Sequence, residues 1–403
     1  MTSLPPDYDR GAPSAILALF GAYLLMMLVG FSILRSPLAA PRGAEITLDR
    51  AIFTVINAST LTGFQLSVTP QQYKLGGQIA ILVMTIGASL FTMIVGSAAV
   101  ARIVRLPFTF RQIVIAAVVA EVLAIAIGTM LLMRPGVRML TAAMLAAGAF
   151  GNSGVHIGGV PGLLDWRTHA LLLPLALIGG LGLAVKMDLV RSVRHGQPLS
   201  KHSRVVLAMT AGLYLLGMLS IFAIEWRTGA APSQLASTAA ASSAAAMNAR
   251  TYGSPLEWLA TVPRAAQWII MLLMAIGANP GGTGGGIKTA TIAVLFIGAR
   301  AALAGRVPGR AFGIACTWLA VYGGLVAAAM LVLLPSQPDI DADRLLMLCI
   351  SAASNVGLSH DTVTIVGPGL YTLAFTMLAG RLVPLLILWW MATTTEDADI
   401  AVG

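Results

Sequence analysis

Residues 51–64 read AIFTVINASTLTGF, an apolar segment that ends in a short polar string with a glycine. As a helix, the stretch Ala51–Thr62 would measure about 18 Å at about 1.5 Å per residue. The hydrocarbon core of a bilayer is about 30 Å thick, so this helix is too short to cross it. We expect a re-entrant hairpin, in which a half-helix enters the membrane and an extended stretch returns. Such a backbone is tolerated at membrane depth only where protein or a water-filled path surrounds it.

The same arrangement recurs three more times. Met139–Ser153, Leu235–Ala249 and Leu345–Val356 are further short segments that are apolar or rich in small residues. Each of the four leads into a string with a glycine, here called a glycine string. The strings are Thr60-Leu61-Thr62-Gly63-Phe64, Gly151-Asn152-Ser153-Gly154-Val155, Arg250-Thr251-Tyr252-Gly253-Ser254 and Ser354-Asn355-Val356-Gly357-Leu358. Their glycines recur at intervals of about 100 residues, which indicates an internal repeat.

Longer apolar runs flank the half-helices. Hydrophobic residues make up 57% of the 403-residue chain and charged residues 10%, whereas a soluble domain has about 25% charged residues. A water-soluble globule and a disordered chain are therefore excluded. Eight runs are long enough to span a bilayer, and the first is expected to be a retained span, not a cleaved signal. The runs are Ser14–Leu34, Leu75–Ala101, Gln112–Met133, Thr168–Val185, Val205–Ile224, Ala265–Ala299, Ala311–Leu334 and Leu370–Thr395.

This pattern predicts an all-α polytopic membrane protein. Four span–pore-helix–span repeats would lie in a pseudo-fourfold arrangement around a central ion pore. We expect the repeats at residues 1–105, 106–195, 196–305 and 306–403. The connectors between repeats are short and basic, which favours a cytoplasmic position for them and for both termini. The net charge of +9 is then explained by basic residues that flank spans, and no nucleic-acid partner is expected.

The glycine strings suit the coordination of a cation. Backbone carbonyls around one axis can replace the water shell of an ion, and glycine admits φ values that other residues resist. The half-helix C-termini add partial negative charge. The alternative is that small residues at these helix ends only permit close packing. We expect the selectivity filter to comprise Leu61, Thr62, Gly63, Asn152, Ser153, Gly154, Thr251, Tyr252, Gly253, Asn355, Val356 and Gly357.

A second glycine-rich segment, Gly277–Thr289, interrupts the run Ala265–Ala299; we call it the glycine loop. A phosphate-binding loop would need the lysine directly after a glycine and a strand before it, but Ile287 intervenes here. Proline and repeated glycine instead break a helix, and such a break survives at membrane depth only beside a cavity. We expect a flexible gate made of Gly281, Gly282, Thr283, Gly284, Gly285, Gly286 and Lys288, together with Arg381.

Arg381 lies near the middle of the last apolar run, too deep for its charge to reach the interface easily. A charge buried in a membrane segment is a candidate for a functional site, and we expect a positive barrier that contacts the glycine loop. The alternative is an ion pair with Glu121 that fixes helix packing.

Three further polar residues follow the expected filter glycines: His156, His360 and Asp361. They are expected either at the rim of the outer mouth or in solvated loops.

Together these features resemble the Trk/Ktr/HKT superfamily of potassium transporters. Its members have four such repeats with a filter glycine in each, a glycine-rich loop that breaks the second span of the third repeat, and an arginine in the last span. The resemblance covers essentially the whole chain, and the glycine loop is its most specific part. The matching positions are Gly63, Gly154, Gly253, Gly357, Asn279–Thr289 and Gly380-Arg381-Leu382.

The resemblance implies potassium uptake across the cytoplasmic (inner) membrane by a pore-forming subunit. It implies K+ as the transported ion at the filter, no bound cofactor, no enzymatic activity and, from the four glycines, a preference for potassium over sodium. It also implies a homodimer and a cytosolic nucleotide-binding regulatory subunit of the TrkA/KtrA kind. Three alternatives stay open: a sodium-permeable or sodium-coupled cation transporter of the same architecture, a secondary carrier of an organic solute, and a non-conducting membrane scaffold.

Overall fold

The computed structural model describes residues 12–40, 46–65, 69–229, 232–251, 259, 262–360, 363–394 and 400–402. The helices follow the repeat seen in the sequence. First spans are α1 (Ala12–Leu34), α4 (Phe110–Leu132), α8 (Lys201–Arg227) and α12 (Arg310–Ser336). Half-helices are α2 (Leu48–Ser59), α5 (Met139–Gly151), α9 (Leu235–Thr251) and α13 (Ala342–Ala353). The order first span, half-helix, second span occurs four times, which confirms the all-α architecture.

The second spans differ more among themselves than the first spans do. Those of the first and fourth repeats are the continuous helices α3 (Leu75–Ile103) and α14 (Pro368–Thr394). In the second repeat a π-turn, η2 (Thr168–Leu172), leads into α6 (Leu173–Gly180) and α7 (Leu183–His195). In the third, α10 (Arg264–Ala275) and α11 (Thr289–Leu303) flank the glycine loop. Two 3-10 turns, η1 (Pro70–Gln72) and η3 (Pro232–Gln234), complete the described elements.

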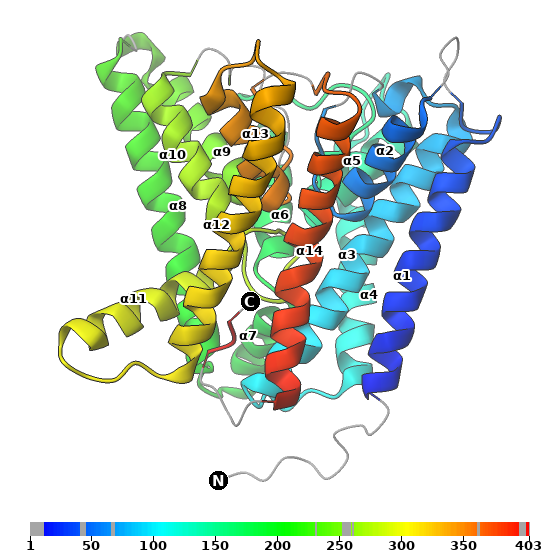
Figure 1. Ribbon diagram of the computed structural model, residues 1–403. Helices are drawn as coiled ribbons and strands as arrows, with labels where there is room; N and C mark the ends of the chain where they lie inside the picture. Colours follow the sequence, from blue (N-terminus) through cyan, green and yellow to red (C-terminus); the bar gives the residue numbers. More distant parts are fainter. Residues whose placement is uncertain are drawn as a thin grey trace.

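The four half-helices gather in one half of the molecule, between the long helices (Figure 1). They are short, and α2 and α13 have 12 residues each. At about 1.5 Å per residue such a helix covers about 18 Å, and after α2, α5 and α13 the chain leaves the helix and continues as non-helical backbone, as the sequence predicts. Six helices of the described residues are long and apolar enough to cross a membrane, or seven if the bent second span of repeat two is one.

Burial separates an outer ring of helices from an inner one. In the first spans α1, α4, α8 and α12 the most apolar window is 17–33% buried, whereas in α3 and α14 it is 67% and 50% buried. Leu17 and Leu28 on α1 are 75% and 66% exposed. Apolar side chains can stay exposed there because lipid tails solvate them as well as a protein interior would. The first spans thus face lipid, while α3 and α14 lie in the interior.

One expectation about the spans is wrong. The run Thr168–Val185 was expected to be a single span, but the chain turns by 99° between Gly180 and Leu183. Gly182 has φ +83, and a Cβ there would lie 2.5 Å from the carbonyl oxygen of Pro280 in the glycine loop. The turn therefore depends on a positive φ and on a close approach of two backbones, both of which favour glycine. Hydropathy along this run cannot reveal a neighbour that lies 98 residues away in the chain.

Candidate ion pathway

The first glycine string begins where α2 ends. Thr60, Leu61, Thr62 and Gly63 are all buried, and Leu61 and Gly63 have φ values of 57° and 88°. A left-handed leucine is uncommon and costs about 1–2 kcal/mol. Two positive φ values separated by one residue set this backbone apart from an ordinary extended strand. The string therefore has a defined backbone conformation and is not a flexible linker.

Asn57, in the last turn of α2, fixes this shape. Its side-chain oxygen accepts hydrogen bonds from the backbone N–H groups of Gly63 and Phe64, both at 2.9 Å. Its side-chain nitrogen donates to the carbonyl oxygen of Phe64 at 3.0 Å. The amide thus pairs three buried main-chain groups that an extended, non-helical stretch would otherwise leave unsatisfied. Sequence reasoning missed Asn57, although a polar residue inside an apolar half-helix was a signal for it.

We expect Asn57→Ala to destabilise the protein by about 2 kcal/mol or more, because two buried N–H groups lose their acceptor. Thermal unfolding in detergent would measure the loss. Ser59→Ala is the matched control, since Ser59 is buried in the same helix and its hydroxyl has no partner among the described residues. Equal stability of the two variants would show that Asn57 does not hold the string.

The second and fourth strings repeat the geometry of the first. Asn152 and Asn355 stand two residues before their glycines, as Leu61 does, and have left-handed φ values of 55° and 49°. The Asn152 side-chain nitrogen donates to the carbonyl oxygen of Ala176 on α6 at 3.1 Å. That of Asn355 donates to the carbonyl oxygen of Met377 on α14 at 2.8 Å. Each asparagine therefore ties its string to the second span of its own repeat, an equivalence expected of a true repeat.

Three of the four strings meet. A Cβ added to Gly63 would collide with the main chain of Gly154, and one added to Gly357 would collide with the carbonyl oxygen of Thr62. The Asn355 side chain also donates to the Thr62 hydroxyl at 3.2 Å. Backbones nearly 300 residues apart thus touch, and only glycine permits this closeness.

The predicted filter residues fall into two groups. The structure brings together nine of them, all buried: Leu61, Thr62, Gly63, Asn152, Ser153, Gly154, Asn355, Val356 and Gly357. In the third string, Thr251 is the last residue of α9, while Tyr252 and Gly253 lie outside the described residues. For the described strings the sequence contains no carboxylate, so the negative potential there comes from carbonyl oxygens and from the half-helix C-termini.

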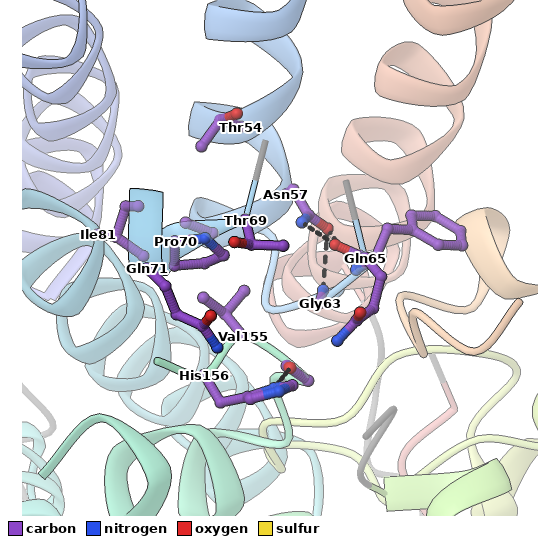
Figure 2. Close-up of a pocket in the computed structure, with 13 residues that line it drawn as sticks. Thr54, Asn57, Gly63, Gln65, Thr69, Pro70, Gln71, Ile81, Val155 and His156 are labelled. Atoms are coloured by element: carbon purple, nitrogen blue, oxygen red, sulfur yellow. Dashed lines mark hydrogen bonds between the residues drawn. The ribbon is translucent and has the colours of Figure 1, made fainter. Parts of the chain in front are cut away.

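A cavity of about 110 Å³ opens above the first and second strings. Gly63 and Gly154 line it, together with Gln65, Gln71 and His156, and Figure 2 shows these polar side chains around the space. A ring nitrogen of His156, Nδ1, lies 2.9 Å from the carbonyl oxygen of Gly154. The histidine therefore lies at this mouth, whereas His360 is not among the residues that line the cavity and Asp361 lies outside the described residues.

The glycine loop lies directly beneath the strings and approaches the ends of the half-helices. The Thr283 hydroxyl donates to the carbonyl oxygen of Phe150 on α5 at 3.1 Å. A Cβ on Gly284 would lie 3.4 Å from the carbonyl oxygen of Arg250 on α9, and one on Gly285 would overlap that of Ser354 after α13. The loop is buried throughout. Its glycines thus serve close packing, and the flexible loop expected from the sequence is instead a tightly packed one.

Two basic side chains complete this layer. Lys288 is buried and donates from Nζ to the carbonyl oxygen of Gly284 at 2.6 Å. Arg381, on α14, is 3% exposed. Its Nε and Nη2 donate to the carbonyl oxygen of Thr60 at 2.8 and 2.5 Å, and its Nη1 donates to that of Thr283 at 2.6 Å. Arg381 therefore joins the first string to the glycine loop.

The alternative partner for Arg381 is excluded. The carboxylate of Glu121 accepts a hydrogen bond from the Ser89 hydroxyl at 2.7 Å, between α4 and α3, whereas Arg381 bonds main-chain carbonyls.

Beneath the loop, the space between Lys288 and Arg381 amounts to a cavity of only about 10 Å³, about enough for one water. The structure thus has a cavity above the strings and little free space at the loop.

Arg250 also contacts the glycine loop, and the sequence did not indicate this role. Its guanidinium donates to the carbonyl oxygens of Ile276 and Gly277, at 3.3 and 3.2 Å, and to that of Thr210 at 3.3 Å. The first two carbonyls lie where α10 ends and the glycine loop begins. A helix end buried in a membrane protein needs such partners, and the charge of Arg250 supplies them.

Fold and geometry together define a class: a polytopic membrane protein in which re-entrant half-helices bring glycine strings to a common point above a buried loop. No family model matches the chain. The Ktr system potassium uptake protein B of Vibrio alginolyticus is 28% identical, over 96% of this chain and 94% of that protein. The potassium/sodium uptake protein NtpJ of Enterococcus hirae is 27% identical, over 75% of this chain and 73% of that protein.

A solved structure shows the same fold. The potassium transporter TrkH of Vibrio parahaemolyticus superposes with a TM-score of 0.70 over 97% of this chain and 87% of that one, at 14% identity. These comparisons confirm the resemblance to the Trk/Ktr superfamily that the glycine strings, the glycine loop and Arg381 indicated in the sequence.

Proposed function

We propose that the protein is the pore-forming subunit of a potassium uptake system in the cytoplasmic membrane. The observation that carries this proposal is the contact between the main chains of Gly63, Gly154 and Gly357 below a water-accessible mouth. Carbonyl oxygens around such a point can replace the hydration shell of a cation. The relatives named as potassium uptake proteins support potassium as the ion.

Within this proposal each predicted site has one task. The four glycine strings, including Thr251, Tyr252 and Gly253, select the ion. Gly281 to Gly286 and Lys288 form the gate, and Arg381 adds a positive barrier at its upper edge. The repeats divide near residues 105, 195 and 305, with the basic connectors and both termini in the cytoplasm. Relatives named as proteins of a Ktr system support assembly with other subunits, namely a second copy of this chain and a cytosolic nucleotide-binding subunit.

A sodium-permeable transporter of the same architecture is the second candidate, because one relative is named a potassium/sodium uptake protein. Purified protein in liposomes would separate the two. We expect uptake of potassium and of rubidium, with sodium carried far more slowly. Equal uptake of sodium would favour the second candidate, and absence of any cation flux would contradict both.

The gate can be tested by shortening the loop. Removing Gly284 and Gly285 takes away the residues that pack against Arg250 and Ser354. We expect flux to rise at least about tenfold, which a shift of about 1.4 kcal/mol toward the open state would produce. Removing Arg306 and Val307, which are exposed in the connector before α12, is the matched control. If the shortened protein folds and its flux equals that of the control, the loop is not the gate.

A further inference from the structure

The two broken spans bind each other. The N–H groups of Asn279 and Thr283, in the glycine loop, donate to the carbonyl oxygens of Gly180 and Gly179 at 3.1 and 3.3 Å. In the opposite direction, Leu183 N–H at the start of α7 donates to the carbonyl oxygen of Gly281 at 3.2 Å. The break in repeat two is therefore paired, main chain to main chain, with the glycine loop of repeat three.

A serine on a third helix joins this pairing. The Ser97 hydroxyl, fully buried on α3, donates to the carbonyl oxygen of Gly281 at 3.3 Å and accepts from Ala184 N–H at 3.2 Å. The carbonyl of Gly281 thus has two donors, Leu183 N–H and the Ser97 hydroxyl. A Cβ on Gly96 would lie 2.7 Å from the Gly281 Cα, so the loop is pressed against α3 at this point.

Helix α7 leads from this junction to the membrane surface. It has 13 residues, a length of about 20 Å. The buried carboxylate of Asp188 accepts hydrogen bonds from Ser200 N–H at 3.0 Å and from the Ser203 hydroxyl at 2.7 Å. Ser200 and Ser203 stand at the start of α8, so α7 is attached to the loop at its first turn and to the next repeat one and a half turns later.

We propose that the break in repeat two is the latch of the gate, and that α7 is the arm that releases it. Leu183 N–H and the Ser97 hydroxyl hold the carbonyl of Gly281 in the closed position, and a displacement of α7 withdraws the first donor and loosens the second. This inference rests on the proposed function, because it assumes that the glycine loop gates a cation path.

The physical basis is a choice between two sets of partners. A carbonyl at membrane depth needs a hydrogen bond, since an unpaired one costs several kcal/mol. In the closed arrangement α7 and Ser97 satisfy Gly281, and little space is left beside it. In an open, hydrated path, water takes over this role at nearly equal strength. The loop therefore has two satisfied positions, and the donors on α3 and α7 decide between them.

Ser97→Ala tests the latch. Removing one hydrogen bond of about 1 kcal/mol is expected to raise rubidium flux per folded molecule in liposomes by about fivefold. Ser97→Thr keeps the hydroxyl and is expected to restore low flux. Ser89→Ala is the matched control, because Ser89 is buried on the same helix and bonds Glu121, not the loop. If the flux of the Ser97→Ala protein equalled that of the Ser89→Ala protein, the proposal would be overturned.

A reversible cross-link tests the arm. Ser97→Cys with Ala184→Cys joins α3 to the first turn of α7, in a protein whose own Cys316 and Cys349 are replaced by alanine. Oxidation is expected to lower flux by about fivefold or more, and reduction to restore it, while each single-cysteine protein is insensitive to oxidation. Flux that is unchanged after complete cross-linking would overturn the role of α7.

The outcomes separate the two proposals. A parent protein without cation flux contradicts the proposed function and the latch together. A parent that conducts and responds to loop shortening, but is indifferent to Ser97→Ala and to the cross-link, contradicts the latch alone.

Discussion

Gly357→Ser is expected to abolish most potassium flux while the protein still folds. A Cβ at this position would collide with the carbonyl oxygen of Thr62 and lie 2.7 Å from the carbonyl carbon of Gly63. The first and fourth strings would have to separate, and steric overlap of this kind costs about 1–3 kcal/mol. Because the carbonyls must stay in place to replace water around an ion, we expect flux to fall at least about tenfold and the preference for potassium over sodium to shrink.

Gly136→Ser is the matched control for Gly357→Ser. Gly136 has φ +85, close to the +86 of Gly357, but a Cβ there meets nothing within 4 Å. Both variants carry the strain of a left-handed residue, and only one crowds the pathway. Radiotracer rubidium uptake in liposomes, with sodium as competitor, compares the two. If Gly357→Ser retained the uptake and ion preference of Gly136→Ser, the contact between strings would be irrelevant to conduction.

Arg381→Ala is expected to raise flux at least about tenfold. The guanidinium bridges Thr60 and Thr283 through their carbonyl oxygens, so its removal detaches the glycine loop from the first string. It also removes a positive charge beside the proposed cation path, and two unit charges 4 Å apart interact by about 4 kcal/mol near a protein surface. Both effects favour cation passage. Flux would be normalised to folded protein measured by size exclusion.

Two further variants separate charge from bridging at this position. Arg381→Lys keeps the charge but lacks the fork that reaches two carbonyls at once, so an intermediate flux is expected. Arg310→Ala removes an arginine at the start of α12 that stacks over Trp390 of α14, at 5.7 Å from the ring centroid, and should leave flux unaltered. An arginine that only supports packing would instead lower the yield of Arg381→Ala without changing flux per molecule.

The sequence predicted the features that depend on local length and composition. A half-helix too short to span is visible in Ala51–Thr62, and the interruption at Gly277–Thr289 is visible in its glycines and proline. Both are confirmed, because hydropathy and helix propensity act within a few residues. The equivalence of the strings followed from their spacing, and it is found again in the left-handed φ values of Leu61, Asn152 and Asn355.

The features that the sequence did not predict depend on distant contacts. The turn at Gly182 is set by Pro280, and the position of Arg381 by carbonyls on two other segments. Composition also misled in one respect, because six glycines between Gly277 and Gly286 suggested looseness, whereas nearly every one of them admits a neighbouring backbone. Propensity describes what a segment can do alone, and tertiary packing decides which of these possibilities is used.

Anomalous diffraction from crystals grown in rubidium would locate the ion relative to the glycine strings. We expect an anomalous peak on the axis between the strings, with no carboxylate ligand. It should lie within coordinating distance of main-chain carbonyl oxygens of Thr62 or Gly63, Gly154 and Val356 or Gly357. A rubidium peak confined to side-chain ligands elsewhere, with none between the strings at saturating rubidium, would contradict it.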